Sequence, residues 1–219
     1  AQGYKDVKER SAMVKFKAVS EENTYFLAWT TTPWTLPSNL GLVVNPEVDY
    51  VKVSYEEQNL IMAEALMESV FANKEGERQV VARFKGKDLE RMEYVPLYNY
   101  AEGKLKKKAF FVMCDDYVTT SDGTGIVHTA PAFGEDDARV CRNYDMDFVQ
   151  YVDAKGNLTA ETDWEGVFVK DADPMILENL RNSGKLFKAP KFEHSYPHCW
   201  RCDTPLIYYA RESWFIKMT

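Results

Sequence analysis

The chain has 219 residues, of which 45% are hydrophobic and 14% aromatic, enough apolar material for one sizeable domain or two small ones. Its formal net charge of −7 excludes a protein that coats a long nucleic-acid backbone, because such binding needs a basic surface that displaces counterions. No apolar run approaches the roughly 18 residues of a membrane span, and the N-terminus lacks the apolar core of a secretion signal, so we expect a cytoplasmic protein without a membrane partner.

Short β-rich segments dominate the chain and predict a mainly β fold, either a closed or curved β-barrel, with helices at its periphery. Most of these segments alternate polar and apolar residues or form apolar runs bounded by Gly, Pro, Asn or Asp, which is typical of half-buried strands. The seven predicted strands are 13–19, 23–30, 40–44, 50–55, 79–84, 108–114 and 125–130.

Three segments predict helices. Residues 63–76 place apolar residues on one face and end at a glycine. Residues 134–144 begin with three acidic residues, which favour the positive end of a helix. Residues 171–184 offer Asp173 as an N-cap with Pro174 at the first helical position.

The composition changes near residue 190, where Pro, His, Cys and aromatic residues become concentrated. We therefore expect a main domain over residues 1–190 and a connector over residues 191–219.

The segment "WTTTPWTLPSN", residues 29–39, begins in the last two residues of a predicted strand and continues beyond it. Pro33 and Pro37 forbid both continued strand pairing and an ordinary helix start before them, so the threonines lie at a strand end. Hydroxyls and free backbone N–H groups can there point at a ligand. The alternative is a Ser/Thr-rich turn that satisfies only its own backbone.

The second notable segment is "DGTGIVHTAPAFGEDD", residues 122–137. Its glycines allow sharp turns into a strand that presents His128, and the chain then reaches a helix that carries Asp137. A histidine buried in the core and a carboxylate that only caps a helix are the purely structural explanations.

The two segments together resemble the editing domain of isoleucyl-tRNA synthetase, specifically the cytosolic eukaryotic type, and the resemblance covers nearly the whole chain. "AWTTTPWTLPSNLGLVVNP" resembles the threonine-rich peptide of that domain, and "GTGIVHTAPAFGEDDARVC" resembles its second motif. "AQGYKDV" and "HSYPHCWRCDTPLIYYARESWF" look like the segments that enter and leave it. The valyl and leucyl relatives typically carry Thr-Thr-Arg-Pro, so the sequence is more similar to the isoleucyl branch.

The resemblance implies a hydrolase that removes valine from isoleucine tRNA. One missing methylene is worth only about 1–3 kcal/mol, so the synthetic pocket of such a synthetase cannot reject valine, a limit for which this enzyme family is itself the standard example. The editing pocket would admit valine, exclude isoleucine and use a positioned water without a covalent intermediate.

The resemblance also implies catalytic residues. Asp137 would bind the α-ammonium group of the substrate, because a carboxylate is the natural partner of that cation. Thr30, Thr31 and Thr32 would hold the ester, the terminal ribose and the attacking water.

Three further residues would bind substrate by the same resemblance. His128 and Trp34 would form part of the wall that faces the amino-acid side chain and ribose. Asn39 would fix the loop or contact the adenosine.

The implied partners are the acceptor end of isoleucine tRNA carrying valine and the remainder of the synthetase. Unpaired nucleotides can be bound by stacking and ribose contacts without a basic surface. No cofactor is implied, and the chain lacks the His-Ile-Gly-His and Lys-Met-Ser-Lys-Ser signatures of an ATP-dependent aminoacylation site.

The cysteines and lysines leave further hypotheses open. Cys199 and Cys202 have the C-x2-C spacing of half a zinc site, with His194 and His198 nearby, but a reduced pair without metal is the simpler interpretation. Lysines cluster at 104–108 and 185–191, which would suit a non-catalytic nucleic-acid-binding module. An editing domain of the valyl or leucyl sibling and a protein-interaction barrel without a substrate are also compatible with the sequence.

Overall fold

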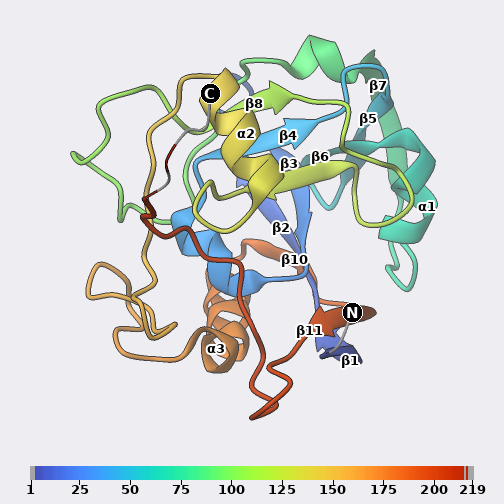
Figure 1. The fold of residues 1–219 in the computed structure, drawn as a ribbon. Coiled ribbons are helices and arrows are strands. Elements are labelled where there is room, and N and C mark those ends of the chain that lie inside the picture. The colour runs from blue at the N-terminus through green and yellow to red at the C-terminus, as the bar shows by residue number, and fades with distance from the viewer. Residues whose placement is uncertain (1–2, 215, 217–219) are drawn as a thin grey trace.

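A computed structural model describes residues 3–214 and 216, and its main feature is a strongly curved sheet with a few helices around it (Figure 1). The prediction of a mainly β fold with peripheral helices is confirmed. The sheet curls into a half-barrel, and within the described residues its end strands do not pair with each other to close it. No helix in the described part of the chain is both long and apolar enough to cross a membrane.

The main sheet has nine strands, and its hydrogen-bonded path runs β7-β5-β6-β3-β9-β4-β8, with β2 paired to β3 and β10 paired to β2. The strands are β2 (Ala12–Lys17), β3 (Thr24–Thr30), β4 (Gly41–Val44), β5 (Asp49–Tyr55), β6 (Gln58–Ala63), β7 (Arg78–Lys85), β8 (Phe111–Cys114), β9 (Ile126–Thr129) and β10 (Leu186–Lys188). All seven predicted strands are present, although the predicted segment 108–114 is a strand only from Phe111 onward.

Strand β3 changes partner along its length, and this positions the site. Its first half pairs in parallel with β6, where Phe26 lies opposite Ile61. Near its end it pairs in parallel with β9, where Trp29 lies opposite Val127. Because parallel strands have their carboxyl ends at the same edge of a sheet, the segments that follow β3 and β9 emerge side by side.

Helix α2 (Glu135–Asn143) lies against the β4–β8 end of the sheet, and its prediction is confirmed. Its buried residues Val140 and Cys141 join a small core cluster with Val43 and Phe111. Burial of a single such side chain stabilises the fold by about 1.5–3 kcal/mol, so this cluster fixes the helix against the sheet.

The predicted helix at residues 63–76 is largely wrong. The structure contains only a 3-10 turn, η2 (Glu64–Leu66), followed by the four-residue helix α1 (Met67–Val70). Asn73 adopts a left-handed conformation with φ of 61°, which ends any continuation toward Gly76.

Helix α3 spans Val169–Asn182, so it begins five residues before Pro174, the predicted first helical residue, and the predicted N-cap is wrong. Asp173 lies inside the helix, and its side chain turns toward another segment rather than toward its own helix end. Gly184 follows the helix with φ of 72°, as expected of a terminating glycine.

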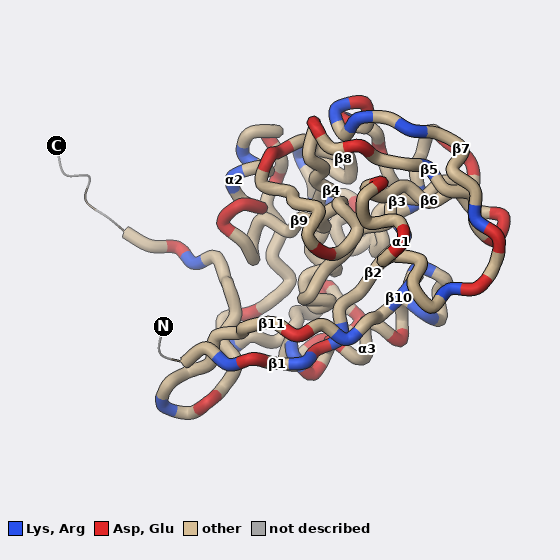
Figure 2. The backbone as a smooth tube through the Cα atoms, turned by 90° about the vertical axis from the view of Figure 1, so that its right-hand side faces the viewer, with Lys and Arg blue, Asp and Glu red and all other residues tan. Residues whose placement is uncertain are grey.

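A separate two-stranded ribbon pairs the first strand of the described chain with the last. Strand β1 (Tyr4–Arg10) pairs antiparallel with β11 (Lys191–Pro197), with Val7 opposite His194. Neither strand was predicted, because β1 is mostly exposed with few apolar residues, and β11 is only partly buried. Figure 2 shows these charges along β1, and the expected domain boundary at residue 190 remains a prediction that falls just before β11.

Candidate functional site

The threonine segment forms a rigid turn at the end of β3. Pro33 blocks further strand pairing, and the short 3-10 helix η1 (Pro33–Ser38) begins there. The Thr35 amide donates to the Thr32 carbonyl over 3.0 Å, and the Thr35 hydroxyl donates to the same carbonyl over 2.8 Å. The hydroxyl of Thr30 accepts the Thr32 amide at 3.1 Å. These hydrogen bonds hold Thr30, Thr32 and Thr35 in fixed positions relative to one another.

The second segment supplies a carboxylate at the same edge of the sheet. Strand β9 ends at Thr129, and after a short loop α2 carries Asp137 in its first turn. The Ala130 amide donates to Asp137 Oδ2 over 2.9 Å, which holds the carboxylate against the end of β9. Its position therefore depends on the strand as well as on the helix.

The two segments enclose one cavity of about 260 Å³. Its lining contains four threonines, two aromatic residues, one valine, one histidine and one carboxylate. These residues are Trp29, Thr30, Thr31, Thr32, Thr35, Val127, His128, Phe133 and Asp137. A cavity of this size with convergent polar groups suits a small polar ligand better than a protein chain.

A buried chain of hydrogen bonds fixes the histidine. The Tyr94 hydroxyl donates to Asn39 Oδ1, and Asn39 Nδ2 donates to the Gly41 carbonyl and, over 2.9 Å, to His128 Nδ1. Because Nδ1 accepts, Nε2 carries the proton and donates to the Thr35 hydroxyl over 2.8 Å. Each hydrogen bond in the chain from Tyr94 through Asn39 and His128 to Thr35 therefore has a defined donor and acceptor.

Burial keeps this histidine neutral. His128 is only 5% exposed, and loss of hydration lowers its pKa to about 3. Neutral imidazole presents no positive charge to the cavity, so it does not repel a cationic ligand. It also cannot act as a general acid at neutral pH.

Asp137 has the opposite shift. Burial raises its pKa from the ordinary 3.8 to about 6, although the hydrogen bond from the Ala130 amide opposes that rise. At pH 7 the carboxylate is therefore mostly ionised but poorly solvated. A poorly solvated anion beside a small cavity favours a cationic partner there.

The structure brings together five of the seven predicted site residues: Thr30, Thr31, Thr32, His128 and Asp137 line the cavity. Two predicted contact residues lie behind it. Trp34 is 2% exposed and packs against Phe133 with ring centroids 4.9 Å apart. Asn39 is buried and bonded to His128, so its side chain fixes the loop and does not line the cavity.

Four lining residues were missing from the predicted site. Trp29 and Thr35 belong to the threonine segment, whose two indoles and four threonine hydroxyls make it stand out in the sequence. Val127 and Phe133 flank His128 in the second segment, where strand alternation alone does not indicate which side chains face a cavity.

We expect Asn39→Ala to destabilise the chain by about 2–4 kcal/mol, because Tyr94 and His128 both lose a buried hydrogen-bond partner. Urea denaturation measures the loss. The matched control is Asn182→Ala at the exposed end of α3, which should stay within about 0.5 kcal/mol of the parent chain. Equal stability of the two variants would contradict this account of the network.

The cysteine pair lies apart from the cavity, in the turn after β11. The Cys202 thiol is 3.2 Å from the Thr204 hydroxyl, and that hydrogen bond lowers its pKa. His198 contacts the Tyr196 carbonyl, and His194 contacts Glu9, so neither histidine completes the pair. In residues 3–214 and 216, no group of three or more His, Cys, Asp or Glu residues could hold a metal ion.

The lysine clusters mostly pair with acidic side chains or carbonyls, and Figure 2 shows basic and acidic residues interspersed along the backbone. Lys107 Nζ lies 2.5 Å from Asp145, and Lys188 Nζ donates to the Ala72 carbonyl over 2.7 Å. These contacts give no support to the hypothesis of a nucleic-acid-binding module with a basic track.

Sequence comparison finds close relatives along the whole chain. No family model matches. The isoleucine–tRNA ligase of Clostridium acetobutylicum is 55% identical over 220 residues, covering 100% of this chain and 21% of that protein, and the enzyme of Clostridium novyi matches equally well. The chain thus spans about a fifth of the length of these curated relatives. Both are bacterial, so they do not test the expected cytosolic eukaryotic subtype.

Structure comparison concerns the fold. The Plasmodium knowlesi cytosolic leucyl-tRNA synthetase editing domain superposes with a TM-score of 0.60 and 13% identity, covering 84% of this chain and 97% of that one. The Plasmodium falciparum cytosolic leucyl-tRNA synthetase editing domain has a TM-score of 0.64 and 10% identity, covering 83% and 99%. At such low identity these matches identify a shared architecture.

Proposed function

The chain belongs to the isoleucine–tRNA ligase family as an editing domain, and from that premise we propose that it hydrolyses the ester of valine on isoleucine tRNA. The observation that carries the proposal is the cavity itself. It joins a poorly solvated carboxylate, a group of threonine hydroxyls and a neutral histidine. That set matches an aminoacyl ester, which has a cationic amine beside an electrophilic carbonyl.

The carboxylate would bind the α-ammonium group. A charge-assisted hydrogen bond in a poorly hydrated site is about twice as strong as a neutral one, and it fixes the adjacent ester carbon relative to Thr30, Thr31 and Thr32. Holding the reacting groups in place removes much of the entropic barrier to attack by water. Asp137 is thus proposed to bind and orient the substrate.

The reaction needs no nucleophile from the protein. Water adds to the ester carbonyl carbon, the bond from that carbon to the ribose oxygen breaks, and a proton passes from water to that oxygen. Threonine hydroxyls and backbone N–H groups would orient the water and stabilise the developing negative charge on the carbonyl oxygen. The products are free valine and uncharged tRNA.

The proposed partners follow from the substrate. The acceptor end of the tRNA would enter the cavity, and the remainder of the synthetase would supply most of the tRNA affinity. The chain's own surface need not be basic, because unpaired nucleotides can be held through stacking and ribose contacts.

A single-turnover assay tests the proposal. The chain, in large excess to compensate for weak tRNA binding, is mixed with isoleucine tRNA carrying either valine or isoleucine. We expect valine release at least about tenfold faster than isoleucine release, since one methylene in a shaped pocket is worth about 10–200-fold. Release of both amino acids at the spontaneous rate would contradict the proposal.

The acid limb of the pH profile should follow Asp137. Its carboxylate must be ionised to pair with ammonium, and its pKa is about 6, so kcat/KM should fall about tenfold per pH unit below pH 6. The acid limb of the kcat profile should lie at lower pH than that of kcat/KM, because the bound ammonium group stabilises the ionised form of Asp137. After subtraction of spontaneous hydrolysis, a kcat/KM that is constant from pH 7 to pH 5 would contradict this role.

A further inference from the structure

The threonine turn has an unusual N-terminal cap. The 3-10 helix η1 begins after Thr32, whose own side chain makes no capping hydrogen bond. Pro33 has no N–H group, so the Trp34 amide is the first donor of the turn that needs a partner. Asp173 Oδ1 accepts that amide over 2.9 Å, from a helix 139 residues further along the chain.

This cap leaves the threonine hydroxyl available to the cavity. A Ser or Thr at the start of a helix normally turns its hydroxyl back to its own backbone N–H groups. Here the carboxylate of Asp173 takes that place, and the Thr32 hydroxyl lies 3.3 Å from both the Thr30 and the Thr35 hydroxyls. The threonine therefore keeps its side chain among the cavity-lining groups.

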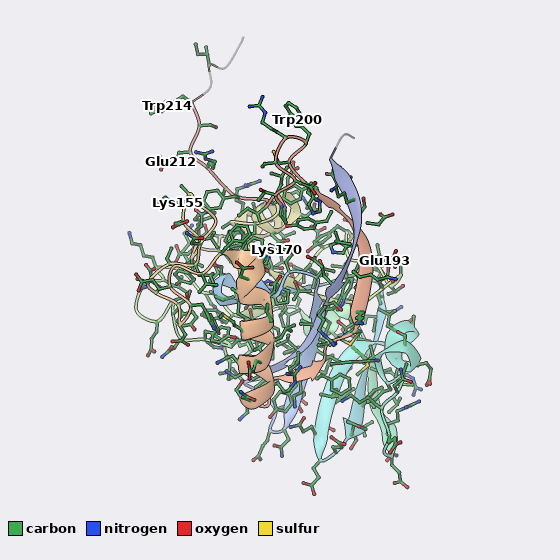
Figure 3. All side chains as sticks on the ribbon, turned by 90° about the horizontal axis from the view of Figure 1, so that it is seen from below. Lys155, Lys170, Glu193, Trp200, Glu212 and Trp214 are labelled. Atoms are coloured by element: carbon green, nitrogen blue, oxygen red, sulfur yellow. The ribbon has the colours of Figure 1, made fainter. Side chains whose placement is uncertain are left out.

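Asp173 is itself held by charge. Lys170 Nζ lies 3.7 Å from Asp173 Oδ2 and 2.6 Å from Glu9 Oε1 of strand β1. Glu9 Oε2 in turn lies 3.2 Å from His194 Nε2 of strand β11. Figure 3 labels Lys170 at the start of α3, with the β1–β11 ribbon running beside that helix.

Burying the Asp173 carboxylate inside a helix is energetically unfavourable, which indicates that its hydrogen bond to the Trp34 amide has a compensating role. The Asp173 side chain is 17% exposed, and its burial raises its pKa to about 7 despite the nearby lysine. Alanine is a better helix former at such an interior position. A partly buried carboxylate inside a helix is therefore explained by its contact with the turn rather than by the helix.

We propose that Asp173 is a positioning residue for the site, which holds the threonine turn by capping the Trp34 amide in place of the Thr32 hydroxyl. The structural role of Asp173 is independent of the proposed hydrolysis, and only its expected effect on the reaction rate rests on that proposed function. Lys170 and Glu9 extend the support to the β1–β11 ribbon.

Two substitutions of Asp173 distinguish the effect of its hydrogen bond to the Trp34 amide from the effect of its negative charge. Asp173→Ala removes the acceptor, while Lys170 keeps its pair with Glu9, so the helix should still form. Asp173→Asn keeps an acceptor oxygen for the Trp34 amide and removes only the charge. The matched control is Asp171→Ala, at an exposed position on the same helix.

The first readout is hydrogen exchange of the Trp34 amide by NMR, which requires no substrate. We expect strong protection in the parent chain, in Asp173→Asn and in Asp171→Ala, and at least about tenfold faster exchange in Asp173→Ala. An unprotected Trp34 amide in the parent chain would overturn the inference without any variant. Unchanged exchange in Asp173→Ala would overturn it as well.

The second readout is valine release under single-turnover conditions. We expect Asp173→Ala to lower the maximal rate about 10–100-fold with the half-saturating protein concentration changed less than threefold, and Asp173→Asn to recover the rate to within about threefold. If the parent chain releases no valine, the proposed function fails, but the exchange result still decides the role of Asp173. If Asp173→Ala retains the parent rate, the positioning role fails and the proposed function stands.

Discussion

Replacement of Asp137 by alanine is expected to lower kcat/KM for valine release about 100- to 1000-fold. Removing one partner of a poorly hydrated charge pair costs about 2–5 kcal/mol, and each 1.4 kcal/mol corresponds to a factor of ten. The ammonium group of the substrate would lose its counter-ion, and the ester carbon would lose its fixed distance from the threonine turn. Single-turnover deacylation of valine-charged isoleucine tRNA measures the loss.

The neighbouring Asp136 provides the matched control. It has the same charge one residue away, but it is exposed and pairs with Arg139 at 3.0 Å. Asp136→Ala should keep kcat/KM within about threefold of the parent value. Equal losses from both substitutions would indicate a general effect of charge and would contradict the assignment of Asp137.

Asp137→Asn distinguishes loss of function from loss of fold. The folded-state pKa of about 6 lies above the ordinary 3.8, so this group contributes stability that is present below pH 3.8 and lost as the pH rises through 6. At pH 8 the ionised carboxylate therefore costs the fold about 3 kcal/mol, which the neutral amide does not. We expect Asp137→Asn to be inactive yet more stable than the parent chain at pH 8.

The second large effect is expected at His128, where alanine should reduce the preference for valine over isoleucine to below about threefold. The imidazole is held by Asn39 on one side and Thr35 on the other, so it cannot move aside for an additional methyl group. Removing it enlarges the cavity, and isoleucine release should rise at least about tenfold. Parallel assays with tRNA carrying each amino acid measure the ratio.

His198→Ala is the control for this experiment, because that residue lies in the turn after β11 and contacts the Tyr196 carbonyl. It should leave the ratio unchanged. A His128→Ala variant that slows both reactions equally, without any change in their ratio, would show that the histidine supports the site without shaping its selectivity.

Sequence patterns predicted most of the sheet because local alternation and strand burial agree there. Strands such as β3 and β5 carry buried apolar residues bounded by turn residues, and both were found. Strand β1 was missed because its residues are mostly exposed and its pairing with β11 depends on contacts nearly 190 residues apart. The helix end at Asn73 was missed because a positive φ at asparagine leaves only a weak signal.

The site was partly predictable for a different reason. Thr30 to Thr32 and Asp137 lie in two local motifs, and the parallel pairing of β3 with β9 brings those motifs together. The roles of the other residues around the site depend on hydrogen bonds between segments that are distant in the sequence, which local patterns do not reveal. Asp173 looks like a helix cap in sequence and caps another turn in the structure, while Asn39 holds His128 rather than facing the cavity.

The most direct measurement is a crystal structure of the chain with valine joined to the ribose of adenosine by a non-hydrolysable amide. We predict that the valine ammonium lies within about 3.2 Å of an Asp137 carboxylate oxygen, with the valine carbonyl beside the hydroxyls of residues 30–32. A mimic bound outside this cavity, or bound with its ammonium group turned away from Asp137, would contradict the account.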